Sequence, residues 1–548
     1  MPLRPLLAVV PIVALLALAA PAGAAVAPGQ VTFPLESRTI PSIDVMTPNV
    51  GVARPDGGVV LAGVDRRRGV RLLAVRRDGR PDPGFGRRGL VRVAVPFDNA
   101  TIGPMPVALL GRPDGRMLVA YRGAPRASLL EPGRIQVAGL TAAGALDPSF
   151  GQVGVTDPGI QLGCDAAACS PAALQPDGSL LLAGTVSRRE GDERDPYPVS
   201  SFSWVVVRLT PDGRLDQGFG DGGIATVALG GAIGLSVAVA PDGGILTVGV
   251  VEEGVSRIAR LTPDGLPDLA FGGGSVAAGQ ARDLLVRPDG SVLAIGPDGV
   301  RRFTPSGAPD LAFGEQGLVA GVTGKLLAVP DGVVAVDQPD GRDGRARLRV
   351  ARIAAGGALA VERTVTLAFG GGYASRFARI NPPRVTPLVQ TTYRAGRAVA
   401  RPDGSILVPG GVAVVEPTGE GEGVQHEEAA LVGLAPDLRL DPQLGGPPRA
   451  ARLRLKLPAQ RAGYAVKVVA TTSGPGLAEV RITYGKRVLA RSTAAVWRTG
   501  RQRISVLLTR TGRRLLLRSD VRRRVTVTAR FRDLVGRRAS ARTRGYLR

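Results

Sequence analysis

The chain of 548 residues is poor in histidine and cysteine, two side chains that many enzymes use for acid–base or metal chemistry. It contains a single histidine, His426, and two cysteines, Cys164 and Cys169. One histidine is too few for a multi-histidine zinc site and gives no support to a serine–histidine–aspartate triad. We find no catalytic residue, metal ligand or cofactor-binding residue in the sequence. We therefore predict a protein that is not an enzyme and uses no cofactor.

The chain also lacks an apolar run long enough to cross a membrane. The longest run, residues 6–20, is shorter than the roughly 20 residues that a spanning helix needs. Arg4 precedes it, and the small residues Ala22, Gly23 and Ala24 follow it, which is the pattern of a secretory signal. We predict a signal peptide over residues 1–24. The mature chain is then secreted, extracellular or cell-surface associated, without a transmembrane segment.

Aromatic residues make up only 4% of the chain, and six of the 12 phenylalanines occupy one repeated position. The stretch RLTPDGRLDQGFGDGG (208–223) is a complete copy of the repeated pattern. Because a phenylalanine buries a large apolar area, we interpret this position as a wedge between neighbouring sheets. The repeated aspartate is expected to hydrogen-bond the backbone of its turn. These structural anchors are Asp82, Phe85, Asp147, Phe150, Asp216, Phe219, Asp268, Phe271, Asp310, Phe313 and Phe369, followed by Asp441 and Leu444 in an altered last copy.

A second signature places Pro-Asp-Gly between two strand-like apolar runs. Pro and Asp fit the corners of a type I turn, and Gly fits the left-handed conformation that follows, so each copy predicts a β-hairpin. Around Pro241 we predict one four-stranded unit with strands near 224–229, 235–241, 245–251 and 256–261. Four strands per repeat are typical of propeller blades, so we predict an all-β fold with a seven-bladed β-propeller. The seven prolines are Pro55, Pro113, Pro176, Pro241, Pro288, Pro330 and Pro402.

The two alternating signatures, RLTPDGxLDxxFGxxG and AVxPDGxILxxG, resemble the delta-60 repeat family of bacterial secreted proteins. The resemblance covers about residues 29–446, and we assign residues 25–446 to the propeller. It implies an extracellular repeat scaffold and supplies no catalytic residues.

The two ends of the repeat region complement each other. GQVTF (29–33) resembles GIATV (223–227), the strand that follows each Phe-Gly-x-x-Gly, and the last repeat stops at Gly446 without such a strand. We therefore predict that the N-terminal strand completes the last blade and closes the ring. Closure would remove an exposed sheet edge.

The connections without either signature share the opposite face of the sheets, because successive strands alternate in direction. They vary in sequence, and we expect any specific ligand to contact them near 190–195, 337–345 or 416–428. His426 lies in the last of these segments, where we expect a solvent-exposed loop.

The last 100 residues carry all of the net charge. Residues 449–548 hold 27 Lys or Arg and three Asp or Glu, which leaves 43 basic and 43 acidic residues in the rest of the chain. Alternating runs such as RLRLKL (452–457) and RVTVTARF (524–531) predict strands with arginines on the solvent side. We predict a basic immunoglobulin-like β-sandwich over residues 447–548.

Such a charge concentrates polyanions around the domain. Candidate partners are an anionic cell-wall polymer, an acidic polysaccharide, lipid head groups or a protein ligand. Nucleic acid is not expected, because the signal exports the chain. The alternative is a solvated surface that only keeps the domain soluble.

Two functions stay open. The first is a non-enzymatic binding scaffold, acting as a monomer, with the propeller connections recognising a ligand and the basic domain anchoring it. The second is an extracellular carboxylate-dependent hydrolase or lyase that acts on polysaccharide, since a propeller of this size offers many Asp and Glu residues. Charged side chains converging at the ring axis would favour the second.

The two cysteines generate a prediction. Cys164 and Cys169 are separated by four residues, and in an exported chain we expect a local disulfide between them. Alkylation of the unreduced protein followed by intact-mass analysis should show no added label. A mass that corresponds to two labelled thiols would contradict the disulfide.

Overall fold

The computed structural model describes most of the chain between residues 24 and 547. The described ranges are 24–27, 29–33, 48–65, 69–95, 104–122, 134–161, 170–190, 199–229, 232–251, 254–330, 332–338, 347–367, 373–374, 388–418, 421–445, 451–461, 463–473, 476–496, 500–517, 521–533 and 538–547. The predicted signal sequence up to residue 23, Cys164, Cys169 and Phe369 lie outside these ranges.

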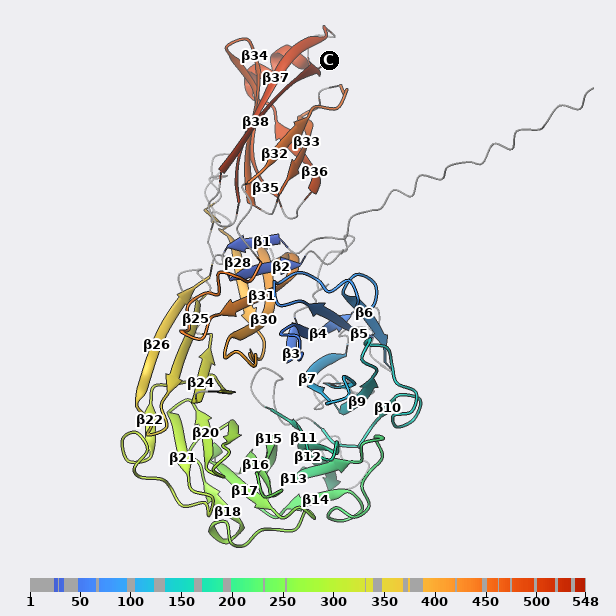
Figure 1. Cartoon of the computed structure of the whole chain (residues 1–548). Helices are drawn as coiled ribbons and strands as arrows, with labels where there is room; N and C mark the ends of the chain where they lie inside the picture. Colours follow the sequence, from blue (N-terminus) through green and yellow to red (C-terminus); the bar gives the residue numbers. More distant parts are fainter. Residues whose placement is uncertain are drawn as a thin grey trace, which may run out of the picture.

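Six sheets of four antiparallel strands follow one another along the chain, and within each sheet the strands pair in chain order. Figure 1 shows them arranged around a ring, with the first strand of each sheet near the centre and the fourth at the rim. The sheets are β3 (Pro48–Ala53), β4 (Val59–Asp65), β5 (Gly69–Val75), β6 (Leu90–Ala94); β7 (Met105–Gly111), β8 (Met117–Arg122), β9 (Ile135–Leu140), β10 (Val155–Thr156); β11 (Ala172–Leu174), β12 (Leu180–Glu190), β13 (Val199–Leu209), β14 (Ile224–Val227); β15 (Ile233–Val239), β16 (Ile245–Val250), β17 (Ser256–Leu261), β18 (Ser275–Ala277); β19 (Asp283–Val286), β20 (Val292–Gly296), β21 (Gly299–Phe303), β22 (Leu318–Ala320); and β23 (Lys325–Val329), β24 (Gly332–Asp337), β25 (Arg347–Ile353), β26 (Leu359–Thr366).

A further sheet joins the two ends of the repeat region. It contains β27 (Tyr373–Ala374), β28 (Leu388–Ala395), β29 (Val399–Ala400), β30 (Ile406–Thr418) and β31 (Gly421–Leu434), together with the N-terminal strands β1 (Ala24–Ala27) and β2 (Gln30–Phe33). β2 pairs antiparallel with β31, from Gln30 opposite Val432 to Phe33 opposite Ala429. The first strands of the described chain therefore lie beside the last strand of the repeat region.

The Pro-Asp-Gly turns join the first and second strands of a sheet, as the sequence pattern predicts. At Pro241 the turn is closed by a hydrogen bond from Gly243 N–H to Ala240 O, and Gly243 has φ of 84°. This left-handed conformation is accessible to glycine at little cost, which is why the third position of the signature is Gly.

Our predicted four-stranded unit, residues 224–261, was wrong by one strand. β14 pairs with β13 of the preceding sheet, whereas β15 to β18 form the next sheet. The reason lies in the Phe-Gly-x-x-Gly turn, which returns the chain directly onto the strand before it. Arg208 N–H donates to Gly223 O at that return. A short 3₁₀ turn, η2 (Gly272–Gly274), occupies the equivalent place in the following sheet.

The apolar core lies between neighbouring sheets. One cluster combines Leu181 and Val206 from one sheet with Ile245 and Leu261 from the next, and Phe219 is buried among them. Each sheet is therefore covered on both faces by the sheets beside it.

The predicted loop 416–428 is largely strand, and a strand also reaches the first residue of the predicted loop 190–195. β12 and β13 remain paired out to Glu190 opposite Val199, and β30 and β31 remain paired out to Thr418 opposite Gly421. The backbone of His426 accordingly lies in β31, not in a loop. The composition of these segments suggested loops, but an antiparallel ladder needs only backbone donors and acceptors, so polar residues can extend it.

The C-terminal region forms two sheets that share one apolar cluster. Figure 1 shows them outside the ring. One sheet contains β32 (Leu453–Lys456), β33 (Ala465–Thr472) and β36 (Gly500–Leu507), and the other contains β35 (Arg487–Val496), β34 (Gly476–Tyr484), β37 (Arg523–Asp533) and β38 (Arg538–Leu547). Our purely β prediction missed the helix α1 (Arg510–Leu516), whose first turn is capped by the Thr509 hydroxyl accepting from Gly512 N–H. Among the described residues, no helix is both long and apolar enough to span a membrane.

Ring closure generates a prediction. Deleting residues 29–46 removes β2 and leaves the buried side chains of Leu431 and Val432 without their partner strand. We expect a lower midpoint of thermal unfolding and aggregation through the freed edge of β31. A shorter deletion of residues 36–44, which keeps β2, is the control. If both deletions melt like the parent, β2 does not close the ring.

Candidate functional site

The repeated phenylalanines lie at the contact between one sheet and the turn of the next. The five described ones are at most 4% exposed: Phe85, Phe150, Phe219, Phe271 and Phe313. Each ring sits against the glycine of the following sheet's turn, as Phe150 does against Gly213. A Cβ atom on Gly213 would lie 2.7 Å from the Phe150 ring, and Gly213 also has φ of 85°, so this position requires glycine. In the last copy Leu444 takes the place of Phe and lies against Gly79.

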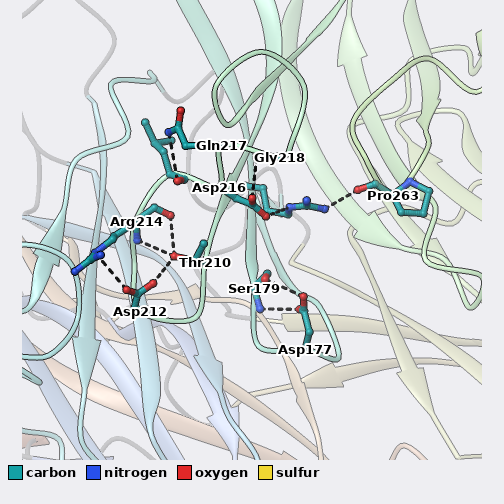
Figure 2. A network of polar contacts seen from close by, with 11 residues as sticks. Asp177, Ser179, Thr210, Asp212, Arg214, Asp216, Gln217, Gly218 and Pro263 are labelled. Atoms are coloured by element: carbon teal, nitrogen blue, oxygen red, sulfur yellow. Dashed lines mark hydrogen bonds and ion pairs between the residues drawn. The ribbon is translucent and has the colours of Figure 1, made fainter.

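The repeated aspartates organise their own turn and bind an arginine. Oδ1 of Asp216 accepts from Gly218 N–H at 3.0 Å, and its Oδ2 accepts from Arg208 Nε at 2.7 Å. Figure 2 shows this network around Asp216, Gly218 and Pro263. The backbone contact recurs in every described copy, at Asp82, Asp147, Asp216, Asp268, Asp310 and Asp441.

The arginine comes from either of two strands. In some sheets it precedes the Phe-Gly turn, as in the pairs Arg208–Asp216 and Arg302–Asp310. In others it ends the first strand, as in Arg54–Asp82, and the equivalent position before the turn is then the small Ala74. In each of these sheets, a guanidinium group from one of the two positions thus binds the carboxylate of the repeated aspartate.

The same arginines also reach the next sheet. Arg208 Nη1 donates to Pro263 O at 2.5 Å, and Arg260 Nη1 donates to Pro305 O at 3.2 Å. Beside this contact, Gly220 N–H donates to Asp264 O at 2.8 Å. We call this combination of Phe, Gly and Arg contacts the inter-sheet clasp. Further arginine contacts of this kind are Arg112 to Pro211, Arg302 to Ala355, Arg352 to Pro436 and Arg401 to Arg77. The repeat signature contains Arg208, but the sequence pattern by itself indicated no role for it.

The arginine that binds the repeated aspartate lowers the pKa of that aspartate, as at Asp82. The hydrogen bond from the Arg54 guanidinium, 2.5 Å away, is the main cause that holds this pKa below its usual value of 3.8. The clasp residues are therefore engaged in holding the sheets together.

A different surface of the chain has the properties of a binding site. In the sheet β35–β34–β37–β38, alternate residues point inward and are buried, such as Val480, Ile482, Val525 and Val527. The intervening residues point to solvent and are mostly basic. We call this surface the arginine face, and its exposed members are Arg481, Arg491, Arg524, Arg530, Arg538, Arg542 and Arg544.

Strand register places like charges beside each other on the arginine face. Arg481 lies directly opposite Arg491, and Thr528 separates Arg481 from Arg542 in the same row. Glu479, opposite Arg530, is the acidic member of the face. Like charges directly opposite each other destabilise a sheet, so this arrangement is unfavourable unless an anion covers it.

Exposed tyrosines adjoin the arginine face. Tyr546 is 45% exposed and Tyr484 is 39% exposed, and both lie toward one end of this sheet. The guanidinium of Arg522 lies 4.4 Å from the Tyr546 ring centre, and that of Arg523 lies 5.5 Å from the Tyr484 ring centre. Stacked arginine and tyrosine offer a cationic and an aromatic surface together.

The remaining predicted site residues do not form a site. Cys164, Cys169 and Phe369 lie outside the described residues, as do most of 190–195 and 337–345. Within the described part of the chain, no group of three or more His, Cys, Asp or Glu is placed to hold a metal ion.

The sheets and their ring-like arrangement define a β-propeller type of protein. Residues 240–271 match a family described as "Domain of unknown function (DUF5122) beta-propeller", which supports a propeller-type repeat. No curated protein matches the chain.

Solved structures similar to the chain include the PQQ-bound aldose sugar dehydrogenase of Streptomyces coelicolor, with 13% identity over 72% of this chain and 96% of that one, at a TM-score of 0.32. A gluconolactonase of Xanthomonas campestris has 14% identity over 63% of this chain and 95% of that one, at a TM-score of 0.27. A protein described as a putative gluconolactonase has 16% identity over 59% of this chain and 90% of that one, also at 0.27.

These matches correct one prediction. We predicted a protein that is not an enzyme, and the similar structures contradict this prediction, because they are described as a sugar dehydrogenase and gluconolactonases. At these identities and TM-scores the matches assign no activity or substrate to this chain.

The clasp generates a prediction for pH. Because the folded-state pKa of Asp82 is lowered, its ionised form stabilises the fold above about pH 4, and this contribution is lost as pH falls through the folded pKa. We expect Asp82→Asn to reduce the free energy of unfolding at pH 7, with a difference from the parent that shrinks as the pH falls below about 4. Urea unfolding at several pH values measures it. In a double-mutant cycle, Arg54→Met should remove most of the pH-dependent part; a difference that stays constant with pH would contradict the ion pair.

Proposed function

We propose that the protein is a secreted or cell-surface-associated delta-60 repeat scaffold that binds an anionic polymer through its basic C-terminal domain. The observation that carries the proposal is the arginine face, where seven exposed arginines share one side of a single sheet. In this proposal the seven sheets of the repeat region are the blades of one closed propeller. The two C-terminal sheets form an immunoglobulin-like sandwich.

Two physical arguments favour an anionic polymer over a merely soluble surface. Arg481 lies directly opposite Arg491, and Arg542 lies in the same row, so binding of counter-charges relieves the repulsion between them. The opposite sheet adds exposed cations at Arg454, Lys456, Lys467, Arg501 and Arg503. A long polyanion can contact both sheets, whereas a small anion covers only a few charges.

Among anionic polymers, the exposed tyrosines favour an acidic polysaccharide. Tyr484 and Tyr546 present aromatic surface next to guanidinium groups, which suits a chain whose sugar rings carry carboxylates. The propeller connections near 190–195, 337–345 and 416–428 are proposed to contact a more specific ligand.

A second candidate function, a carboxylate-dependent hydrolase or lyase acting on polysaccharide, is favoured by one observation. Asp283 is a buried carboxylate on an inner strand of the ring, between two cations. Release of unsaturated or reducing ends from acidic polysaccharide, lost in Asp283→Asn, would support this function.

The binding proposal predicts a steep salt dependence, because binding that releases counterions weakens as salt rises. We expect the full-length protein to be retained on immobilised polygalacturonate at about 50 mM salt and largely released at about 200 mM. The triple variant Arg481→Ser, Arg491→Ser, Arg542→Ser should elute at clearly lower salt.

The matched control removes the same charge from the propeller. Arg80, Arg214 and Arg439 are 62%, 81% and 71% exposed, and each lies beside an aspartate of its own turn. Their triple serine variant should elute with the parent. Equal losses in both variants would show a response to net charge alone, and no retention at low salt would refute the proposal.

A further inference from the structure

The exposed large apolar side chains of the C-terminal domain gather at one end of its two sheets. Tyr484 is the last residue of β34, Leu507 is the last residue of β36, and Tyr546 lies next to the end of β38. We call the whole set the apolar tip. In the described part of the domain its members are Tyr464, Tyr484, Leu507, Leu517, Val521 and Tyr546.

Contacts between the two sheets show that their tip residues share one end. Leu508 N–H donates to Tyr464 O at 3.1 Å, and Leu508 also pairs with Ala490 near the start of β35. Gln460, a few residues before Tyr464, pairs with Leu547 at the end of β38. The end of the first sheet that carries Tyr464 and Leu507 therefore lies against the end of the second sheet that carries the other two tyrosines.

The segment that follows α1 belongs to the same end. Nε of Arg523, at the start of β37, donates to Leu515 O in α1 at 3.4 Å. Leu517 directly follows α1, and Val521 lies between α1 and β37. Val521 is 58% exposed, so a branched aliphatic side chain faces solvent here.

The apolar tip is the end of the domain remote from the propeller. The chain coming from the propeller enters the domain at β32, where Leu453 lies opposite Thr472, the last residue of β33. Tyr464 comes directly before the first residue of β33 and therefore lies at the other end. Figure 1 shows the C-terminal end of the chain, close to Tyr546, on the side of the domain that faces away from the ring. The ring does not obstruct access to the tip.

Arginines surround the apolar tip. The guanidinium of Arg513 lies 5.9 Å from the ring centre of Tyr464, and the other two tip tyrosines have the same kind of partner. Glu479 and Asp533 lie toward the opposite end of the domain, and Asp520, the remaining acid, lies outside the described residues. Further exposed cations at the tip are Lys486, Arg487, Arg510, Arg514 and Arg522.

This combination of side chains fits the surface of an anionic lipid bilayer. Tyrosine and arginine each have an apolar part and a polar end, which suits the boundary between acyl chains and head groups. Leu517 and Val521 gain nothing from water, and an exposed apolar patch rimmed by polar residues is typical of an interaction site. The surrounding cations attract anionic head groups.

We propose that the apolar tip docks on an anionic lipid bilayer. Leu517 and Val521 enter the boundary of the acyl chains, and the tyrosine hydroxyls and guanidinium groups stay among the head groups. The proposal goes beyond polymer binding, which does not use Tyr464, Leu517 or Val521. The strands run away from the tip, so the arginine face stays open to a polymer while the tip is docked.

The test is flotation of the full-length protein with vesicles of equal parts phosphatidylglycerol and phosphatidylcholine. A second arm uses phosphatidylcholine alone. We expect the parent to float with the anionic vesicles and to stay largely unbound with the neutral ones. The triple variant Tyr464→Ser, Leu517→Ser, Val521→Ser should bind the anionic vesicles at least about tenfold more weakly, because several apolar groups no longer enter the bilayer. Thermal unfolding checks that each variant is folded.

The matched control removes exposed leucines from the propeller. Leu266 and Leu311 are 60% and 69% exposed, and the variant Leu266→Ser, Leu311→Ser should float like the parent. A separate reporter, Tyr464→Trp, tests insertion directly and does not depend on the fold of the triple variant. Relative to the parent, its added fluorescence should shift to shorter wavelength on anionic vesicles and be quenched by brominated lipid.

Retention on immobilised polygalacturonate separates this proposal from polymer binding. The triple tip variant should be retained like the parent. If it loses polygalacturonate and vesicles equally, the tip is part of the polymer site and the bilayer proposal is wrong. A parent that floats with anionic vesicles but is not retained on polygalacturonate refutes polymer binding alone.

The bilayer proposal is also overturned by any of three further outcomes. The folded parent does not float with anionic vesicles, or the folded triple variant floats as well as the parent, which would show that surface charge alone binds. Tryptophan at the tip that neither shifts nor is quenched would show contact without insertion. An equal loss in the leucine control would indicate a general effect of exposed apolar residues.

Discussion

The propeller depends on the contact that each sheet makes with the turn of the next one. In the clasp, one aromatic ring is buried against a glycine, one backbone N–H crosses to the neighbouring turn, and one guanidinium bridges a carboxylate to a carbonyl of that turn. The apolar contact buries the aromatic ring, and the polar contacts join each sheet to the turn of the next. Pro, Asp, Gly, Phe and Arg recur in the chain because each fills one place in this contact.

The arginine face differs from the charged positions of the propeller repeat, because its charges are not required by the scaffold. Asp216 is a charged repeat residue whose oxygens are both bonded, so nothing is left for a ligand. The pair Arg481 and Arg491 is different, because two like charges lie directly opposite each other on neighbouring strands. In a repeat protein such exceptions are informative, since the regular positions already account for stability.

Much of the architecture was predictable because turn chemistry is local. The Pro-Asp-Gly hairpins follow from the conformations that these three residues favour, and Phe219 with Asp216 marks the return turn. The predictions that failed concerned which strands pair with each other and how far the pairing extends. The sequence could not show that β14 pairs backward with β13, or that β30 and β31 stay paired beyond the ring. The alternating runs predicted arginines on the solvent side of the C-terminal strands, but only the strand register shows that Arg481 lies opposite Arg491.

The pairing of β2 with β31 has a consequence for the order of folding. Each of the six four-stranded sheets can form from residues close together in the chain, whereas Gln30 must find Val432, about 400 residues later. Closing so long a loop costs conformational entropy that no local contact repays, and such distant contacts form slowly. During synthesis, β2 therefore cannot pair with β31 until almost all of the repeat region has been made. Closure of the ring therefore joins a strand made at the start of synthesis to one made about 400 residues later.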